Sequence, residues 1–199
     1  MRLNAQPLAA LSARHQAPHF EILLRMVNTK GVTVGPDSFL SAAQRYQIMP
    51  EIDRWVVRQA LEMLGPQAYV LADQPVVFTI NFSGQSLKDS DFTDYVVESI
   101  VKSGINPRAL CFELTESAAV GNLTHAEMLI RRLRKLGCGI ALDDFGTGLS
   151  SLAYLRSLPI TMLKIDGSFV RDVLTDPKAE SMIQAVAQLA RALSLVTVA

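Results

Sequence analysis

Two adjacent carboxylates stand at the end of an apolar segment in the second half of the chain. Residues 140–142 (Ile-Ala-Leu) are typical of a buried strand, and Asp143 and Asp144 follow directly, before a Gly-x-Gly turn. Adjacent acids repel each other, and a divalent cation is the usual compensation because hard metals prefer oxygen ligands. The alternative is a solvated acidic turn, and this stretch by itself leaves both interpretations open.

Other apolar runs of the chain end in polar residues in the same way. Asn81, Glu113 and Lys164 each lie at the end of such a run, and Glu21 and Arg25 lie within an apolar segment near the N-terminus. A charged residue in an apolar strand is unusual unless it has a partner or a function. In a β/α barrel the carboxyl ends of the strands meet on one face, so these side chains are expected to share one site.

The elements that would position these residues alternate between strand and helix. Apolar runs predict strands over 3–11, 20–27, 76–80, 109–112, 140–142, 162–166 and 195–199. Amphipathic spacing predicts helices over 36–46, 50–64, 86–103, 124–136, 151–157 and 176–193. The first strand contains Pro7, which suits a sheet edge. This order predicts an α/β fold, either a (β/α)8 barrel or an open doubly wound sheet.

The barrel is the favoured alternative. An open sheet would more often carry a G-x-G-x-x-G loop after a strand, and the sequence has none. A full barrel needs roughly 250 residues, so this chain of 199 residues is short by about one and a half βα units. We therefore expect a TIM-type barrel that is incomplete at its C-terminus.

Composition narrows the class of protein. Hydrophobic residues make up 49% of the chain, enough for one domain with a sizeable core, and the net charge of zero argues against binding to DNA. No run approaches the ~20 apolar residues of a membrane span, and the N-terminus lacks a signal-peptide layout, so we expect a soluble cytoplasmic domain. Cys111 and Cys138 are interpreted as buried core residues, and His15, His19 and His125 as scattered surface or turn residues.

The pooled side chains would form an oxygen-rich metal site. The set comprises four carboxylates and one amide, from Glu21, Asn81, Glu113, Asp143 and Asp144. No His/Cys cluster favours zinc, and four carboxylates exceed what one Mg²⁺ usually takes from a protein. Two metal ions are therefore plausible, an arrangement that activates a water molecule for displacement at phosphorus.

Lys164 and Arg25 suit the same reaction. Lys164 could hold the attacking water or offset charge in the transition state, and the guanidinium of Arg25 matches the geometry of phosphate. Each has a simpler alternative: Arg25 as a snorkelling surface residue, and Lys164 as the partner of a structural acid such as Asp166. Glu116 is as well explained by holding backbone N–H groups of a nearby loop as by catalysis.

Six short motifs occur in a fixed order across essentially the whole chain. They are Gln6-Pro7-Leu8, Glu21-Ile22-Leu23-Leu24-Arg25, Asn81-Phe82-Ser83, Glu113-Leu114-Thr115-Glu116, Asp143-Asp144-Phe145-Gly146-Thr147-Gly148 and Leu163-Lys164-Ile165-Asp166. Through these motifs the chain resembles the EAL-domain family of bacterial cyclic-di-GMP phosphodiesterases. The resemblance implies one EAL domain over residues 1–199, a modified TIM barrel whose first strands run partly antiparallel, without its C-terminal portion.

The resemblance also implies roles for individual residues. Mg²⁺ or Mn²⁺ would be bound by Glu21, Asn81, Glu113 and Asp143, with Asp144 engaging a second metal ion. Lys164 would contact the nucleophilic water, and the dinucleotide would be lined by Gln6, Leu23 and Arg25. A loop braced by Glu116 would couple dimerisation to metal binding, and it comprises Asp144, Phe145, Gly146, Thr147 and Gly148. The implied reaction is hydrolysis of cyclic-di-GMP to linear pGpG in bacterial second-messenger signalling.

The sequence departs from the family pattern in a few places. The signature Glu-Ala-Leu reads Glu21-Ile22-Leu23, an apolar exchange, while Met26 replaces a common aromatic residue and Gln44 a frequent acid. The last residues, 197–199, match the strand before the family's Glu-Gly-Val-Glu motif. We therefore expect the 199-residue chain alone to be inactive, and its unpaired sheet edges to make it poorly stable or self-associating.

Three functions compete at this level: an active phosphodiesterase, a catalytically inactive cyclic-di-GMP receptor, and a regulatory scaffold that has lost nucleotide contact. The retained set of acids argues against the scaffold. Expected partners are cyclic-di-GMP, a second copy of the domain in a homodimer, and an N-terminal sensor or GGDEF domain in the parent chain.

Overall fold

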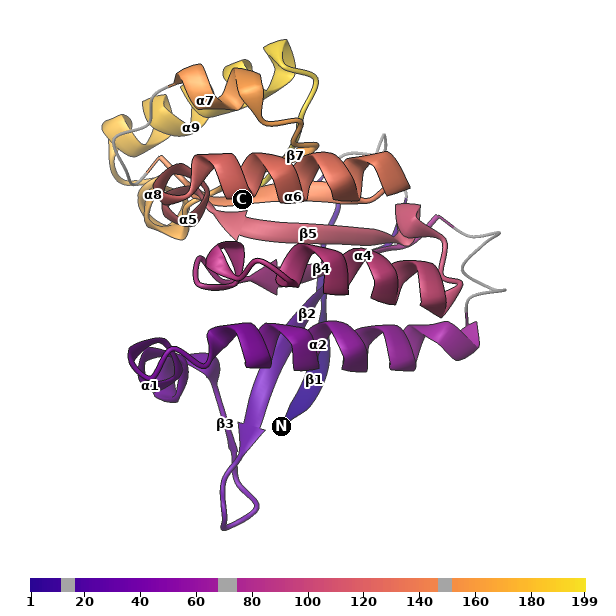
Figure 1. Ribbon diagram of the computed structural model, residues 1–199. Coiled ribbons are helices and arrows are strands. Elements are labelled where there is room, and N and C mark those ends of the chain that lie inside the picture. Colours follow the sequence, from indigo (N-terminus) through magenta and orange to yellow (C-terminus); the bar gives the residue numbers. More distant parts are fainter. Residues whose placement is uncertain (12–16, 68–74, 147–151) are drawn as a thin grey trace.

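A curved sheet with helices on its outer side forms the framework of the molecule. A computed structural model describes residues 1–11, 17–67, 75–146 and 152–199. The main sheet has the strand order β1-β2-β4-β5-β6-β7-β8, and β3 pairs with β2 beside that path (Figure 1). The strands are β1 (Arg2–Leu8), β2 (His19–Val27), β3 (Thr33–Val34), β4 (Val77–Phe82), β5 (Leu110–Thr115), β6 (Gly139–Phe145), β7 (Met162–Ile165) and β8 (Val196–Val198).

The first strand runs opposite to the other strands of the main path. β1 pairs with β2 in an antiparallel register, whereas every pairing from β2 to β8 along the main path is parallel. β1 lies at the edge of the sheet, as Pro7 predicted, because proline has no N–H to give to a second neighbour. The observed architecture is the predicted one, a TIM-type barrel that is incomplete and has an antiparallel start.

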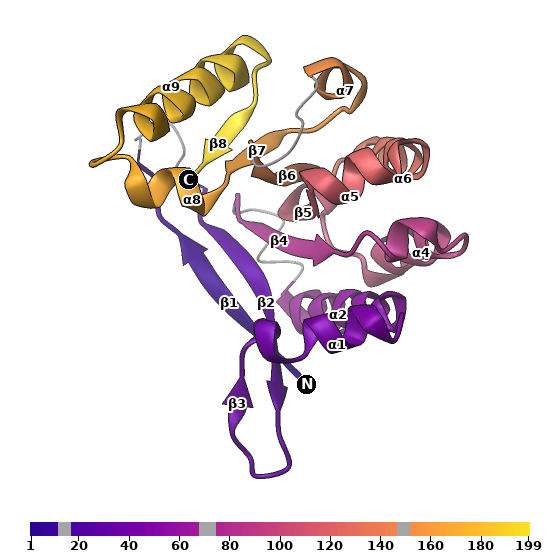
Figure 2. The ribbon, with the colours of Figure 1, turned by 90° about the vertical axis from the view of Figure 1, so that its left-hand side faces the viewer.

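Helices follow the parallel strands and cover the convex side of the sheet, as Figure 2 shows for α2, α4, α6 and α9. The α-helices are α1 (Leu40–Arg45), α2 (Met49–Leu64), α4 (Phe92–Ser103), α5 (Glu116–Gly121), α6 (Leu123–Leu136), α7 (Leu152–Ser157), α8 (Gly167–Asp172) and α9 (Pro177–Ala192). Short 3₁₀ turns are η1 (Pro36–Ser38), η2 (Gly65–Gln67), η3 (Ser86–Lys88) and η4 (Pro107–Ala109).

Two separate apolar clusters lie on the two faces of the sheet. The larger one packs the outward-facing strand residues, such as Phe112 and Leu142, against the apolar stripes of the helices, such as Leu129 of α6. The smaller one lies inside the curve and contains Cys111 and its neighbours on adjacent strands. Because strand side chains alternate between faces, residues two positions from Cys111 also point inward. That parity places Glu113 on the inner face.

Several predicted boundaries were wrong where local hydrogen bonds override the apolar pattern. The helix predicted over 86–103 is divided into η3 and α4, because Asp89 adopts an extended backbone and its carboxylate accepts the N–H of Asp91 at 3.0 Å. Helix α5 was missed, and it begins where the Thr115 hydroxyl accepts the N–H of Ala118. The short strand β3 and helix α8 were also not predicted.

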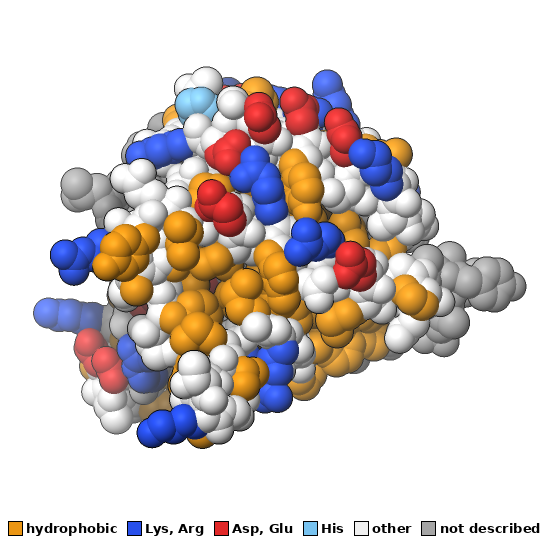
Figure 3. Space-filling model, turned by 60° about the horizontal axis from the view of Figure 1, so that its bottom comes forward, with side chains coloured by type: hydrophobic (Ala, Val, Ile, Leu, Met, Phe, Trp, Pro, Cys, Tyr) orange, Lys and Arg blue, Asp and Glu red, His pale blue; other side chains and the backbone are white. Residues whose placement is uncertain are grey.

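One face of the molecule carries many hydrophobic side chains. Figure 3 brings forward the side of Figure 1 on which α1 and β3 lie, and hydrophobic side chains gather across it. Exposed apolar residues of the segment from β2 to α2 include Val27, Val32, Tyr46 and Ile48. An apolar surface of this kind often marks a contact with another protein. Within the described residues, no helix combines the length and the apolar character needed to cross a bilayer.

The open edge at β8 leads to a testable expectation for the 199-residue polypeptide. Val196 donates its N–H to Thr161 of the neighbouring segment, so the N–H of Thr197, one residue on, points to the edge of the sheet. Unpaired edges pair with other chains. We expect concentration-dependent self-association in sedimentation experiments, reduced by Thr197→Pro and retained by Thr197→Val, which keeps the N–H. A monomer at all concentrations would contradict this expectation.

Candidate functional site

Five polar side chains meet at the carboxyl ends of neighbouring strands. They belong to Glu21 on β2, Asn81 on β4, Glu113 on β5, Asp143 on β6 and Lys164 on β7. In the sheet register Asn81 lies opposite Glu113. Glu21 lies opposite Thr79, which is two residues before Asn81 on the same strand. All five project from the concave face, because side chains of a strand alternate between its faces. For example, Glu113, Asp143 and Lys164 each lie two positions after a residue of the smaller, inner cluster: Cys111, Ala141 and Met162. We call this group the acidic cluster.

Lys164 is the centre of the acidic cluster. Its Nζ lies 2.6 Å from Oε1 of Glu113, 3.4 Å from Oδ2 of Asp143 and 3.6 Å from Oε2 of Glu21. Asn81 joins the cluster by donating from Nδ2 to Oε1 of Glu21 at 3.0 Å. The lysine therefore has the cluster acids as its partners, and Asp166 is instead occupied with the N–H of Ser168 at the start of α8.

Burial and the neighbouring charges shift the pKa values of the acidic cluster. Glu113 is only 1% exposed, and burial raises its pKa to about 8; the adjacent Asp143 adds to the rise, and Lys164 opposes it. Burial by itself lowers the pKa of Lys164, but the carboxylates of Glu113, Asp143 and Glu21 outweigh it and the pKa is raised overall. The cluster thus holds more negative charge than its one ammonium can neutralise.

Asp144 lies beside the acidic cluster, at an irregularity in β6, where the charges of Asp143 and Lys164 act on it. The register between β6 and β7 shifts between Leu142 and Phe145, and Asp144 has a positive φ of 56°, rare for a residue with a side chain. In a regular strand the two acids would point to opposite faces, and the bulge removes that constraint. Burial, followed by the charges of Asp143 and Asp166, raises the pKa of Asp144.

The chemistry of the acidic cluster suits a divalent ion. Within the described residues, no three His, Cys, Asp or Glu side chains already stand in a metal-binding arrangement. The ammonium of Lys164 contacts the carboxylates of Glu113 and Asp143. All the donors are nevertheless oxygens, the ligands that Mg²⁺ and Mn²⁺ prefer. Asn81 uses its NH₂ group toward Glu21, so its carbonyl oxygen is the atom of the amide that could bind a cation. An ion bound here would compete with Lys164 for the same oxygens.

The three residues expected to line a nucleotide lie on the adjacent strands β1 and β2. Gln6 is directly opposite Glu21 in the antiparallel register, so both side chains are on one face of the sheet. Leu23 and Arg25 follow Glu21 at intervals of two residues and share that face. The guanidinium of Arg25 donates to the carbonyl of Leu24 at 2.8 Å. It is half-buried and close to the strand rather than extended from the surface as a snorkelling residue would be.

Glu116 braces the segment that follows β6. Its Oε2 accepts the N–H of Gly146 at 3.1 Å, and its Oε1 accepts the hydroxyl of Tyr154 on α7. Phe145 is buried at the end of β6. This arrangement agrees with the interpretation that Glu116 holds backbone N–H groups of a nearby loop. Thr147 and Gly148, the other loop residues named from the sequence, lie outside the described residues.

Two contacts of the site were not predicted. His19 was interpreted as a surface or turn residue, and this was wrong: it is half-buried, and its Nε2 lies 2.6 Å from the hydroxyl of Thr79 inside the curve of the sheet. Its position two residues before Glu21 on β2 was the available signal. The Tyr154 hydroxyl on Glu116 had no such signal, because the two residues lie in different βα units.

Gly146 provides a test of the segment beyond β6. Its φ is +103°, and an added Cβ would lie 3.0 Å from Cε2 of Phe169. We expect Gly146→Ala to lower the free energy of unfolding by about 1–2 kcal/mol, because alanine is strained at this φ. Urea denaturation measures the change. Gly121→Ala is the matched control, since Gly121 lies in a helix with open space around it; equal effects of the two substitutions would contradict the prediction.

Comparison with known proteins identifies relatives of the chain. The chain is 36% identical over 197 residues to cyclic di-GMP phosphodiesterase PdeB of Shewanella oneidensis, covering 99% of this chain and 23% of that protein. It is 36% identical over 198 residues to cyclic di-GMP phosphodiesterase PdeF of Escherichia coli, covering 99% of this chain and 26% of that protein. The chain therefore spans only a minor part of the length of these relatives.

Solved structures have the same fold. The FimX EAL domain from Pseudomonas aeruginosa bound to c-di-GMP superposes with a TM-score of 0.87 at 27% identity, covering 98% of this chain and 77% of that one. The c-di-GMP complex of the PaMucR phosphodiesterase superposes with a TM-score of 0.87 at 28% identity, covering 98% and 78%. A family model described as the EAL domain matches residues 1–199. The chain belongs to the EAL domain family.

Proposed function

We propose that this chain is the metal-binding and substrate-binding part of a phosphodiesterase that hydrolyses cyclic-di-GMP to linear pGpG. The observation that carries the proposal is the convergence of Glu21, Asn81, Glu113 and Asp143 around Lys164 at one end of the parallel strands. Membership of the EAL domain family and the similarity to proteins named cyclic di-GMP phosphodiesterases support it. The phosphodiesterases of this family are metal-dependent.

The metal ligands in this proposal are Glu21, Asn81, Glu113 and Asp143 for one Mg²⁺ or Mn²⁺, with Asp144 toward a second. When bound, such ions supply positive charge beside the phosphodiester and favour ionisation of a water molecule. With such ions bound, the cluster carboxylates would act as their ligands, and the ammonium of Lys164 would be available to donate to the attacking water. The position of Nζ within 4 Å of three carboxylates supports this role.

Substrate orientation comes from β1 and β2. Arg25 contacts a phosphate oxygen through its planar guanidinium, which matches phosphate geometry. Gln6 and Leu23 lie on the same face and contact the rest of the dinucleotide. In the reaction one phosphorus–oxygen bond to a ribose breaks, the water oxygen bonds to phosphorus, and the leaving ribose oxygen takes a proton. These residues are arranged along two adjacent strands beside Glu21, which supports their placement next to the metal site.

The loop after β6 links the site to partners in this proposal. Glu116 holds Gly146, two residues beyond the ligand Asp144, so a movement of α5 or α7 is passed directly to the metal site. A homodimer through this domain, and an N-terminal sensor or GGDEF domain, would use that route to control activity. The apolar face in Figure 3 supports a protein contact. Because the proposed substrate is a bacterial second messenger, the proposal includes a cytoplasmic location for the domain.

Calorimetric titration with cyclic-di-GMP, with and without Mg²⁺, tests the proposal when it is combined with chromatography for pGpG. The full-length gene product is used, because the chain covers only 23% and 26% of the length of the relatives it matches. We expect binding and Mg²⁺-dependent formation of pGpG. Binding without any pGpG would instead identify a receptor, and the absence of binding would refute both functions.

A further inference from the structure

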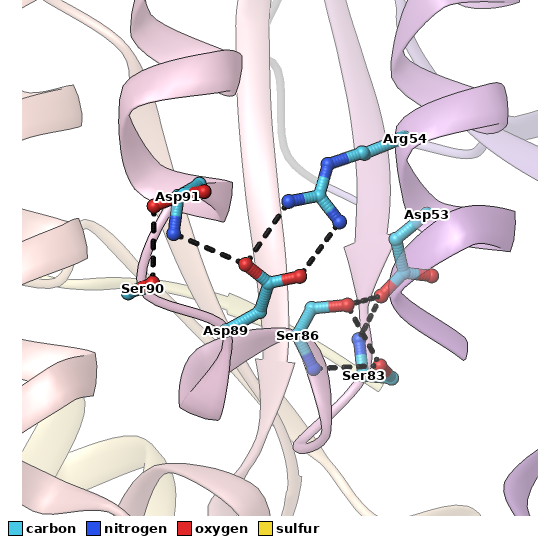
Figure 4. Close-up of polar contacts among 7 residues, drawn as sticks. All are labelled: Asp53, Arg54, Ser83, Ser86, Asp89, Ser90 and Asp91. Atoms are coloured by element: carbon cyan, nitrogen blue, oxygen red, sulfur yellow. Dashed lines mark hydrogen bonds and ion pairs between the residues drawn. The ribbon is translucent and has the colours of Figure 1, made fainter. Parts of the chain in front are cut away.

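A buried carboxylate on α2 holds the turn that follows β4, the strand that carries Asn81. Asp53 of α2 is buried, with 4% of its surface exposed. Its Oδ2 accepts the backbone N–H of Ser83 at 2.8 Å and the hydroxyl of Ser86 at 2.6 Å (Figure 4). Ser83 is only two residues beyond Asn81, so this contact fixes the backbone at the end of the strand that carries Asn81.

A carboxylate is a costly side chain for this position. Burial raises the pKa of Asp53, and the hydrogen bonds from Ser86 and Ser83 oppose that rise. An apolar residue would pack α2 against the sheet without the cost of desolvating a charge. The carboxylate provides instead two directed hydrogen bonds to the turn, which hydrophobic packing does not supply.

The same turn is held on its other sides as well. Ser86 donates its N–H to Oγ of Ser83 at 3.2 Å, and Gln85 donates from Nε2 to the carbonyl of Gln44 at the end of α1 at 2.7 Å. An added Cβ on Gly84 would lie 3.2 Å from Cβ of Ala118, so α5 closes the remaining side. The turn therefore has little freedom to shift while Asp53 holds it.

Asn81 needs such restraint because a metal ligand is effective only in a fixed orientation. Its Nδ2 donates to Glu21, so its carbonyl oxygen is the atom that would bind the ion of the proposed function. We propose that Asp53 is a positioning residue that orients Asn81 for the divalent ion by holding the turn at Ser83 and Ser86. This inference rests on the metal site of the proposed function, and it adds a residue from outside the strand ends.

The neighbouring residue on α2 supplies a matched control. Arg54 forms a bidentate pair with Asp89, with distances of 2.7 and 3.0 Å, and this pair joins α2 to the segment before α4 (Figure 4). It is similar in chemistry and lies on the same helix. Asp89 does bond to Ser86, but through its backbone N–H, which donates to the Ser86 carbonyl at 3.3 Å and which alanine retains. Loss of this pair should affect stability and leave Asn81 in place.

The test measures the dissociation constant for Mn²⁺ in the full-length gene product by electron paramagnetic resonance, at a temperature where each variant is folded. We expect Asp53→Ala to weaken Mn²⁺ binding about tenfold, as loss of a group that orients a metal ligand does. Asp53→Asn should bind nearly as the parent does, because its carbonyl oxygen can accept both hydrogen bonds. Asp89→Ala should melt at a lower temperature with an unchanged dissociation constant.

A double-mutant cycle with Asn81→Ala identifies the route of the effect. Asp53→Ala should have no further effect on Mn²⁺ binding once Asn81 is absent, since its influence passes through that residue. Ser86→Ala is the milder variant, usable where Asp53→Ala fails to fold, and should weaken binding less and only when Asn81 is present. Equal effects in both backgrounds, or none, would overturn the inference and leave the proposed metal site intact. A parent protein that binds no Mn²⁺ would overturn both.

Discussion

Glu113→Gln is expected to lower kcat for cyclic-di-GMP by about 10³-fold, because the carboxylate proposed to bind the divalent ion is lost. Glu113 is almost fully buried and lies 2.6 Å from Lys164 at the centre of the acidic cluster. Glutamine has the same size but no negative charge to bind a divalent ion. Steady-state formation of pGpG at saturating Mg²⁺ measures the effect in the full-length gene product.

The effect of Glu113→Gln should be confined to function. Burial disfavours the charged form of Glu113, so a neutral amide is tolerated, and Lys164 keeps Asp143 and Glu21 as partners. The melting temperature without metal should therefore stay close to that of the parent. Glu127→Gln, which removes an exposed ion pair with Arg131 on α6, is the control and should leave kcat unchanged. A Glu113→Gln variant with more than a tenth of parental activity would refute the role of Glu113.

Lys164→Met is expected to make the stability of the protein depend on divalent ions. Methionine has a similar length but removes the ammonium that faces Glu113, Asp143 and Glu21. Breaking a buried pair leaves uncompensated charge, so the metal-free variant should lose about 3 kcal/mol of unfolding free energy. Because Mg²⁺ binds the native state, it should restore much of this loss. The kcat should also fall by about 10²-fold, since the attacking water loses its donor.

Thermal melts with and without Mg²⁺ measure this dependence for the parent and the variant. Lys135→Met serves as the control, because Lys135 is exposed near the end of α6 and takes no part in the cluster. Mg²⁺ should raise the melting temperature of Lys164→Met more than that of the parent or the control. An equal rise in all three proteins would show that Lys164 does not compete with the ion for the carboxylates.

The strands, and the polar residues expected together at their carboxyl ends, were predicted from local sequence pattern. These predictions were largely correct. Apolar runs identified the seven strands of the main path, with boundaries within a few residues. The boundary errors have a common cause. Asp89 and Thr115 end or begin elements through side-chain hydrogen bonds to the backbone, and these bonds do not alter the apolar periodicity on which the predictions depended. For the same reason η3 and α4 were predicted as one helix.

Pairings across the sheet were harder to predict than the strands themselves. Glu21 and Lys164 are separated by most of the chain, and only the curvature of the sheet brings Nζ to within 3.6 Å of the carboxylate. The bulge at Asp144 depends on the register with β7, and a strand pattern contains no information about its neighbour's register. Asp53 reads in sequence as an ordinary polar residue of an amphipathic helix, although it is buried against the turn after β4.

The sequence by itself determined the chemical type of the site, because it shows directly that residues with oxygen donors follow the apolar runs. It also determined the class of fold, through the alternation of strand and helix periods. Only the tertiary structure decided which polar groups become partners. Lys164 forms ion pairs with three carboxylates, and Glu116 accepts the backbone N–H of Gly146. Those choices depend on distances between βα units, and such distances exist only once the sheet has curved.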